Sequence, residues 1–161
     1  MTGLIGPGYL GDEEIHLVLA NTADADSQNG SAPSYSFQIR RLQDNQLLGG
    51  CTLRVSNSSA LQYSGHISYA IAPAHRGHRY AAKAVRLLLP LAFRNGLPQV
   101  IIACRPDNAA SRRTCLLAGG HFLGILHPPS PEIGQAGDDG ICRYLFCNPL
   151  FTPTTGKTAE I

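Results

Sequence analysis

The chain has 161 residues, of which 43% are hydrophobic and 15% are charged, and its formal net charge is +2. This length fits one domain that buries about 70% of the surface of its unfolded chain, and the composition excludes an intrinsically disordered protein. The small net charge gives no electrostatic attraction that would indicate a nucleic acid or a membrane surface as the partner.

The sequence also predicts a cytoplasmic protein that binds no metal. Its longest apolar run, 85–93, contains Arg86 and Pro90, and it is far shorter than the roughly 20 residues of a membrane-spanning helix. Acidic residues at 12–14 stand where a signal peptide has basic and then apolar residues. The five cysteines include no Cys-x-x-Cys pair, so neither a disulfide framework nor a zinc site is indicated.

The first half of the chain predicts a meander of antiparallel strands. Apolar and polar residues alternate over 35–40 and over 47–55, and the Asp44-Asn45 pair between these segments is typical of a turn, so we expect a hairpin. Further strands are expected at 14–19 and 66–71. The segments expected to be irregular are the glycine-rich start 1–11, the polar stretch 21–33 and the turn 56–59.

Helices and strands alternate in the second half. Apolar residues at helical spacing from Ala81 to Ala92 predict a helix that Asn95-Gly96 ends, and Pro90 is expected to bend it or shorten its last turns. The unbroken apolar run 100–104 predicts a strand that is covered on both faces, which is typical of a parallel strand.

A second helix is expected from the Asp107-Asn108 pair to about Leu117, because Asp and Asn are favoured N-caps and glycine follows the helix. Strands at 120–126 and 142–147 then flank a long loop, 127–140. We expect residues 1–150 to form the domain and 151–161 to be a flexible tail.

The segment 76–81, Arg-Gly-His-Arg-Tyr-Ala, lies between an expected strand and an expected helix. Free N–H groups and the helix dipole make such a helix start an anion site, and small residues let a pyrophosphate approach the main chain. An ordinary basic loop without a ligand fits the hexapeptide equally well. Nucleic acid is a weaker alternative, because the cations stop after Arg79 and no series of aromatic residues accompanies them.

The order of elements over 65–124 resembles the core of the GNAT superfamily of acyl-CoA N-acyltransferases. The family's loop pattern is (Arg/Gln)-x-x-Gly-x-(Gly/Ala), and Arg76 and Ala81 match its first and last positions. The run 105–113, followed by Ala-Gly-Gly at 118–120, resembles the family's Asn-x-x-Ser helix and the turn behind it. Two such motifs in the family's order are more specific than either alone.

This resemblance implies a single-domain α/β (α+β) fold. Its mixed, mostly antiparallel sheet is splayed at the centre between two parallel strands, 66–71 and 100–104, and helices lie on both faces. The implied activity is transfer of an acetyl group from acetyl-CoA, the co-substrate, to a primary amine of a small molecule, peptide or protein. The amine attacks the thioester directly in a ternary complex.

The resemblance also implies where acetyl-CoA binds. The pantetheine arm lies in the splay, on the main chain of Ile71 and Ala72, and Asn108 contacts it from the second helix. The alternative for Asn108 is that it only caps its helix, and the two roles are compatible. The residues expected to bind the cofactor are Ile71, Ala72, Arg76, Gly77, His78, Arg79, Tyr80, Ala81, Asn108 and Ser111.

The sequence departs from the family at two positions. Arg79 occupies the fourth loop position, which is usually Gly, and Cys115 occupies the position, seven residues after Asn108, of a tyrosine that protonates the departing thiolate in many relatives. A non-catalytic CoA-binding relative is therefore a second hypothesis. A third, a nucleic-acid-binding domain, is disfavoured by the near-neutral charge, and it would use Arg76, Arg79, Arg112 and Arg113.

His66 is the candidate general base. The attacking amine must lose a proton, relatives often supply a carboxylate from the strand before the loop, and no Asp or Glu lies between Asn45 and Asp107. A histidine titrates near neutrality, but a structural histidine at the end of a strand is the alternative. Tyr69, three positions on, is expected to point to the opposite face of the strand.

The sequence does not identify the amine acceptor. The stretch 21–33, the hairpin loop and the loop 127–140 are expected to shape its pocket. The N-terminal part is too short for the two helices that usually cover this pocket in the family, which predicts a site that is open or is completed by a second copy of the chain in a homodimer.

Overall fold

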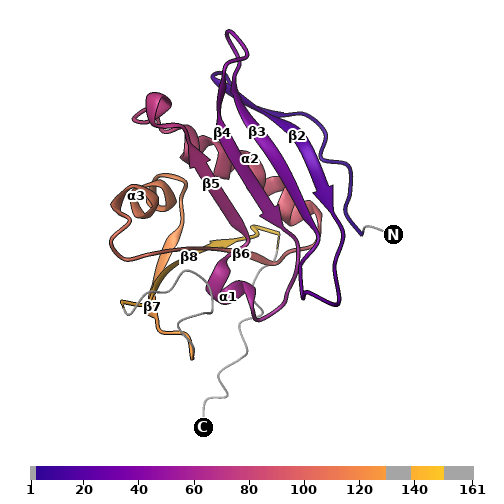
Figure 1. Cartoon of the computed structure of the whole chain (residues 1–161), viewed down its shortest axis with the longest axis vertical. Coiled ribbons are helices and arrows are strands. Elements are labelled where there is room, and N and C mark those ends of the chain that lie inside the picture. The colour runs from indigo at the N-terminus through magenta and orange to yellow at the C-terminus, as the bar shows by residue number, and fades with distance from the viewer. Residues whose placement is uncertain (1–2, 130–138, 151–161) are drawn as a thin grey trace.

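Two antiparallel sheets form the framework of the computed structural model, which describes residues 3–129 and 139–150 (Figure 1). The first sheet has the strand order β1-β2-β3-β4-β5, with β1 at Leu10–Gly11, β2 at Ile15–Ala23, β3 at Ser34–Arg41, β4 at Leu47–Arg54 and β5 at Ile67–Ile71. The second has the order β6-β8-β7, with β6 at Gln99–Cys104, β7 at His121–Leu126 and β8 at Ile141–Cys147.

The helices occupy the connections between strands. The four-residue α1, Leu61–Ser64, precedes β5, and a short 3-10 helix, Pro73–His75, follows it. The long α2, Tyr80–Arg94, links β5 to β6 and lies behind the five-stranded sheet in Figure 1. The last helix, α3, Ala109–Leu117, contacts β6, β7 and α2.

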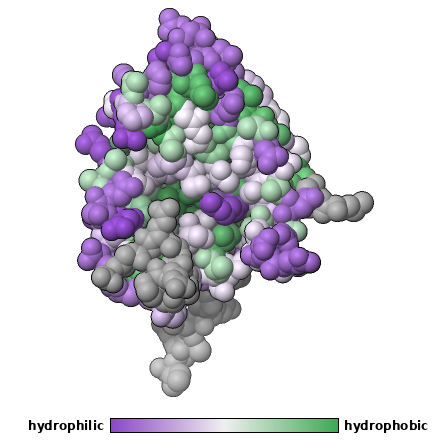
Figure 2. All heavy atoms as spheres, viewed as in Figure 1, coloured by the Kyte–Doolittle hydropathy of each residue, from purple (hydrophilic) through white to green (hydrophobic). Residues whose placement is uncertain are grey.

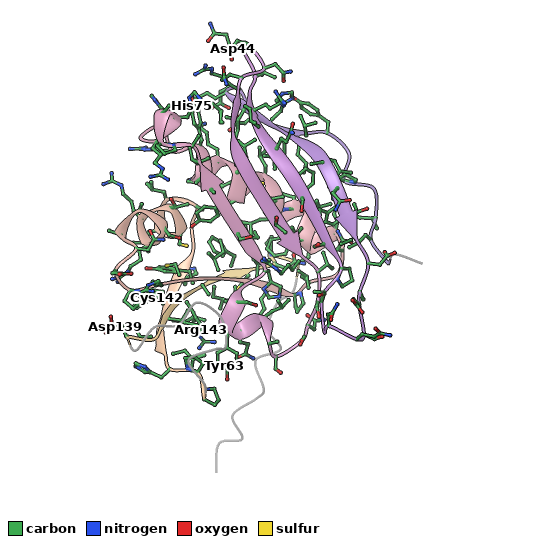
Figure 3. All side chains as sticks on the ribbon, in the orientation of Figure 1. Asp44, Tyr63, His75, Asp139, Cys142 and Arg143 are labelled. Atoms are coloured by element: carbon green, nitrogen blue, oxygen red, sulfur yellow. The ribbon has the colours of Figure 1, made fainter. Side chains whose placement is uncertain are left out.

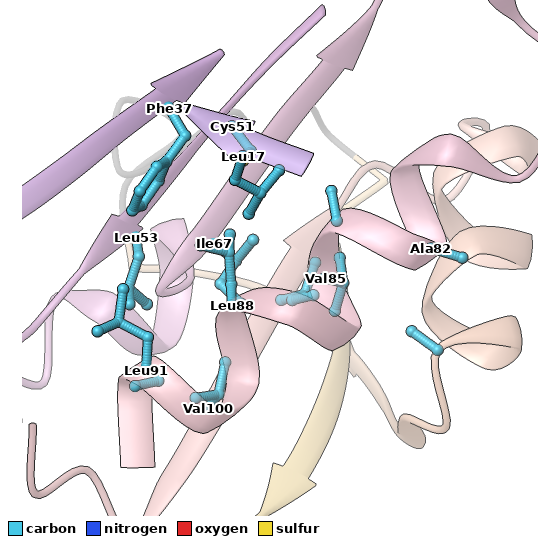
Figure 4. Packing of buried hydrophobic residues seen from close by; sticks show 14 of the residues in the cluster. Leu17, Phe37, Cys51, Leu53, Ile67, Ala82, Val85, Leu88, Leu91 and Val100 are labelled. Carbon is cyan, nitrogen blue, oxygen red and sulfur yellow. The ribbon is translucent and has the colours of Figure 1, made fainter. Parts of the chain in front are cut away.

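The core lies between the five-stranded sheet and α2. Alternate side chains of β3 are buried, as the period of a strand requires, and they face one stripe of α2, as the helical period requires. Figure 4 shows Ile67 and Leu53 from the sheet near Leu88 and Leu91 from the helix. The opposite face of the sheet is in view in Figure 2, with weakly polar and apolar residues in its middle and hydrophilic residues around its rim.

The structure confirms most of the predicted elements and changes several, among them the start of the chain, where β1 at Leu10–Gly11 lies in a segment expected to be irregular. The segment 21–33 is not all loop, because β2 extends to Ala23 and an isolated bridge joins Asp26 to Ser31. The helix α2 continues through Pro90 to Arg94, and α1 is an element that the sequence did not predict. Most of the loop 127–140 and the tail 151–161 lie outside the described residues.

The predicted splay lies between β5 and β6, and the two strands meet only where β5 begins. There the His66 N–H donates to the Ile101 carbonyl at 2.7 Å, and the Ile101 N–H donates to His66 Nδ1 at 2.9 Å. Further along, Tyr69 on β5 lies close enough to Cys104 on β6 for the thiol to influence its pKa. The strands therefore leave the junction in the same direction, as predicted, and the fold class is confirmed. The splay divides the expected single sheet into two separately hydrogen-bonded sheets.

Candidate active site

The edge of β5 that faces the splay has main-chain groups turned away from its own sheet. Gly49 lies opposite Ile71 and Cys51 opposite Tyr69, while the Ala72 N–H donates to the Leu48 carbonyl at 2.9 Å. Because N–H and C=O groups of successive residues in a strand point to opposite sides, the main chain at Tyr69 and Ile71 points into the splay. An extended ligand can therefore bond to this edge as a further strand would.

A cavity of about 510 Å³ lies between β5, the loop before α2, and α3. Tyr69, Ala70 and Ile71 form its β5 side, and Ala110, Ser111 and Thr114 form its α3 side. We call it the cofactor-side cavity. Of the residues predicted to bind acetyl-CoA, those that line it are Ile71, Arg76, Gly77, Arg79, Tyr80, Ala81, Asn108 and Ser111.

Two of the predicted cofactor residues are placed differently. The Ala72 N–H is used in the sheet, so it offers pantetheine no donor, and we remove Ala72 from the proposed contacts. His78 does not belong to the lining described for the cavity, and its ring lies against the Tyr80 ring with centroids 5.3 Å apart. In this structure the Ile71 carbonyl accepts a hydrogen bond of 3.0 Å from Arg76 Nε.

The fourth position of the loop before α2 has a main-chain conformation that favours glycine. Arg79 is the N-cap of α2 and has φ 63° and ψ 21°, in the left-handed region, which costs a residue with a Cβ roughly 1–2 kcal/mol. Arg79 provides no side-chain cap for the helix. The N–H groups of the first turn thus remain available to an anion in the cavity beside them.

A second cavity, of about 310 Å³, lies on the other side of Tyr69. It extends from the start of the splay, between Ser68 on β5 and Ala103 on β6, to Arg54 and α1. We call it the acceptor-side cavity. Three residues line both cavities, and they are Tyr69, Asn108 and Ser111.

Tyr69 therefore lies at the meeting point of the two cavities. Its hydroxyl is 2.7 Å from Ser111 Oγ and 3.7 Å from Cys115 Sγ. Burial raises the pKa of the phenol well above its usual value, so the hydroxyl keeps its proton and can donate a hydrogen bond at neutral pH.

Comparisons with known proteins identify the family of this chain. A family model, the acetyltransferase (GNAT) domain, matches residues 6–121. The chain belongs to the GNAT acetyltransferase family. No curated protein sequence matches it.

Solved GNAT structures share the fold at low sequence identity. An acetyltransferase from Agrobacterium tumefaciens is 17% identical with a TM-score of 0.63, and the match covers 89% of this chain and 96% of that one. A Salmonella typhimurium acetyltransferase that modifies the N-terminal serine of a 50S ribosomal subunit protein is 14% identical with a TM-score of 0.61, over 87% and 99%. Mycobacterium smegmatis RimJ in complex with CoA-disulfide is 21% identical with a TM-score of 0.56, over 76% and 56%.

At the position of the family's tyrosine on α3, this GNAT chain has a buried thiol. Burial raises the pKa of Cys115 to about 12, so the thiol stays protonated and is a poor nucleophile. Asn108 caps the same helix, because its side-chain oxygen accepts the Ser111 N–H at 3.0 Å. Thus Asn108 has the predicted capping role, and it also lines both cavities.

His66 has both ring nitrogens engaged with the main chain. Nδ1 accepts the Ile101 N–H, which leaves Nε2 as the donor to the Ser56 carbonyl at 3.0 Å. Burial lowers its pKa, and the residue is 6% exposed and does not belong to the lining described for either cavity. The general-base role of His66 stays a prediction, but this geometry favours a structural role.

The sequence reasoning missed Tyr69 as a candidate site residue. The signal was present, because alternation along β5 puts Tyr69 on the opposite face from His66. One face of β5 contacts α3 across the splay. The structure shows that the side chain of Tyr69 lies on this face.

Other features bear on the remaining hypotheses. Arg112 donates to the Tyr144 hydroxyl at 3.2 Å and lies over the Phe122 ring, so it packs against the protein's own aromatic residues. Within residues 3–129 and 139–150, no helix is long and apolar enough to cross a membrane, and no group of three or more His, Cys, Asp or Glu side chains could hold a metal ion.

Proposed function

We propose that this chain transfers an acetyl group from acetyl-CoA to a primary amine of a small molecule, peptide or protein. The observation that carries the proposal is the pair of cavities that meet at Tyr69 and Ser111 in the splay of a GNAT fold. The cofactor-side cavity offers acetyl-CoA the start of α2 and two arginines. The acceptor-side cavity gives the amine its own route to Tyr69 and Ser111. This arrangement suits direct transfer between two bound molecules.

On the cofactor side, the pyrophosphate binds the main chain of 77–81, with the cations of Arg76 and Arg79 beside it. The pantetheine arm extends along β5 and bonds to the main chain at Tyr69 and Ile71, the groups that point into the splay. The thioester then lies near the point where the two cavities meet, with Asn108 and Ser111 on its α3 side.

In the reaction the amine nitrogen attacks the thioester carbonyl carbon, a C–N bond forms, and the C–S bond breaks with its electron pair going to sulfur. The attacking nitrogen gives up one proton to water, and the departing sulfur takes up one. We assign the hydrogen bond to that sulfur to the hydroxyl pair of Tyr69 and Ser111, which lies beside the position of the family's tyrosine, here Cys115. Both hydroxyls are neutral at the start of the cycle. If one of them gives its proton to the sulfur, solvent returns a proton to it, so both are neutral again at the end.

The acceptor class is supported by the Salmonella relative, which acts on a protein N-terminus. A peptide or protein amine is therefore among the acceptors that we propose, together with small molecules. A cytoplasmic location and a homodimer that completes the open site also remain proposals.

Two measurements test the function. Calorimetry should show acetyl-CoA binding at one site per chain, and a thiol-release assay over a panel of amines should show turnover that depends on both substrates. Binding without release for any amine would favour the non-catalytic CoA-binding relative. Binding of DNA or RNA in place of acetyl-CoA would overturn the proposal.

A further inference from the structure

The acceptor-side cavity is lined by cations and hydroxyl groups. Arg54 and Arg105 belong to its lining, as do Tyr63, Ser64 and Ser68. Among the described lining residues there is no Asp or Glu. A cavity with this lining has a positive potential, which favours a molecule with a negative charge close to the part that enters.

Arg54 is the cation best placed to bind such a molecule. It ends β4, directly after the buried Leu53, so its side chain lies on the opposite face from the core, and its Nη1 lies 3.5 Å from Ser68 Oγ. The ion pairs found in the described part of the chain give Arg54 no carboxylate, whereas Arg105 Nε lies 3.2 Å from a carboxylate oxygen of Asp107. Among the described residues, the charge of Arg105 is thus partly compensated, whereas Arg54 has no such ion pair.

A second guanidinium lies beside the same cavity. Arg143 lies on β8 and is the partner, in the antiparallel pairing of β6 with β8, of Ala103, which lines the cavity. Its Nη1 donates weakly to Gln62 at 3.5 Å, and its buried Nε has no hydrogen-bond partner among the described residues. Figure 3 shows Arg143 near Tyr63, the cavity residue that follows Gln62 on α1. An unsatisfied buried donor is unfavourable, and Arg143 adds a positive charge near the cavity.

We infer that the acceptor carries a carboxylate within a few bonds of its amine, and that Arg54 binds this carboxylate. The inference rests on the proposed function. A guanidinium matches a carboxylate with two parallel hydrogen bonds, and the cavity of about 310 Å³ has room for a free amino acid or for the first residues of a peptide. Two sources share this chemistry, namely the α-carboxylate of a free amino acid and an acidic side chain next to the N-terminus of a peptide.

The phosphates of acetyl-CoA are a poor alternative for Arg54. The cations assigned to them, Arg76 and Arg79, line the cofactor-side cavity, whereas Arg54 lines only the other one. Tyr69 lies between the two groups of cations. The charge of Arg54 is therefore available to the second substrate.

Matched acceptor pairs test the inference. One pair is a free α-amino acid and its amide, and the other is a short amidated peptide that begins serine–aspartate and its serine–asparagine counterpart. In at least one pair, kcat/KM should be roughly tenfold or more higher for the carboxylate member. The substitution Arg54→Gln should remove this difference, and Arg54→Lys should retain part of it. The control Arg94→Gln, at the exposed end of α2, should preserve it.

The outcomes separate the inference from the proposed function. Equal kcat/KM within both pairs for the wild-type protein overturns the inference and leaves the acetyl transfer intact. An acetyl-CoA affinity that falls severalfold in Arg54→Gln assigns Arg54 to the cofactor and also overturns it. Should no acceptor be turned over, the proposed function fails. Calorimetric binding of the same pairs to the CoA-saturated protein then decides whether Arg54 selects a carboxylate. If Arg54→Gln does not fold, Arg54→Lys is measured in its place.

Discussion

Tyr69 Oη lies 2.7 Å from Ser111 Oγ, across the splay and between residues 42 positions apart in the chain. This contact links β5 to α3 at the point where the two cavities meet. The family commonly places a phenol on the helix. Here a phenol from the strand lies 3.7 Å from Cys115, the residue at that helical position.

The substitution Tyr69→Phe should lower kcat by roughly 10²-fold, because the departing sulfur loses a hydrogen-bond donor. The KM for acetyl-CoA should change by less than about threefold, since the cofactor's phosphates bind elsewhere. Burial raises the pKa of this phenol, so Tyr69 should add no alkaline limb to the pH–rate profile below about pH 10.

Steady-state kinetics of Tyr69→Phe, Ser111→Ala and the double variant check this assignment. If the two hydroxyls act as a unit, the double variant should be little slower than the worse single variant. Tyr9→Phe, at a side chain 73% exposed, is the control. Full kcat in Tyr69→Phe would remove Tyr69 from the mechanism.

His66→Ala should lower the free energy of unfolding by about 1–3 kcal/mol, because the Ile101 N–H and the Ser56 carbonyl lose their partner. His66→Gln should recover part of this loss, since an amide can both accept and donate. His121→Ala, at an exposed side chain, should have little effect. Urea unfolding measures all three, and a large fall in kcat with unchanged stability would instead support His66 as the base.

The same residue predicts a pH dependence of stability. Burial lowers the folded-state pKa of His66, so below its unfolded value of about 6.5 the unfolded chain binds a proton that the folded chain refuses. The free energy of unfolding should therefore fall as the pH drops from about 7.5 to 5.5. His66→Gln should flatten this part of the profile, and an equally steep profile in the variant would assign the effect to other groups.

Arg79→Gly should stabilise the free protein and weaken its binding of acetyl-CoA. Glycine adopts the left-handed conformation of this position without strain, which is worth about 1 kcal/mol. The lost cation should raise the Kd for acetyl-CoA roughly tenfold and reduce its dependence on salt. Calorimetry at two ionic strengths and thermal unfolding measure both effects.

Asn45→Gly is the matched control for Arg79→Gly. Among the described residues, Asn45 and Arg79 are the two non-glycine residues with a positive φ, and that of Asn45 is 58°. Asparagine tolerates this conformation better than arginine does, so the gain in stability should be smaller. The affinity for acetyl-CoA should not change. Tighter binding in Arg79→Gly would show that the side chain crowds the phosphates.

Gly65→Ala should lower the free energy of unfolding by at least about 2 kcal/mol. Gly65 has φ 77° and ψ 163°, a combination nearly exclusive to glycine, and a Cβ there would lie 3.0 Å from both Ala103 N and Ile101 O. The substitution forces β5 and β6 apart at their junction. The control is Gly96→Ala, because Gly96 has φ 90° but open space around it, and its free energy of unfolding should fall by only about 1 kcal/mol. Equal losses in the two variants would mean that the contact of Gly65 with β6 does not constrain the fold.

The elements found from the sequence are those specified by local patterns. The hairpin of β3 and β4 follows from alternation around a turn, and the start of α3 follows from Asn108, whose side chain does cap the helix. The helix α1 has four residues, too few to show a helical period. The polar end of β2 is held by pairing with β3, which no property of its own residues indicates.

The candidate site could be predicted only as far as its main chain. The loop 76–81 has a local pattern, and most of its residues line the cofactor-side cavity. The contact between Tyr69 and Ser111 and the bonds of His66 to Ser56 and Ile101 depend on how β5, β6 and α3 meet in space. Such long-range contacts leave no period or spacing in the sequence.

The free edge of β5 has a consequence for how this protein can diverge. The groups that it presents at Tyr69 and Ile71 are amides and carbonyls, which every residue except proline carries. A ligand recognised by such groups constrains the path of the chain and hardly constrains its side chains. Mutations can therefore accumulate along the cleft, as long as the strands keep their positions. Relatives 14–21% identical to this chain share its fold, and recognition through main-chain groups is compatible with such divergence.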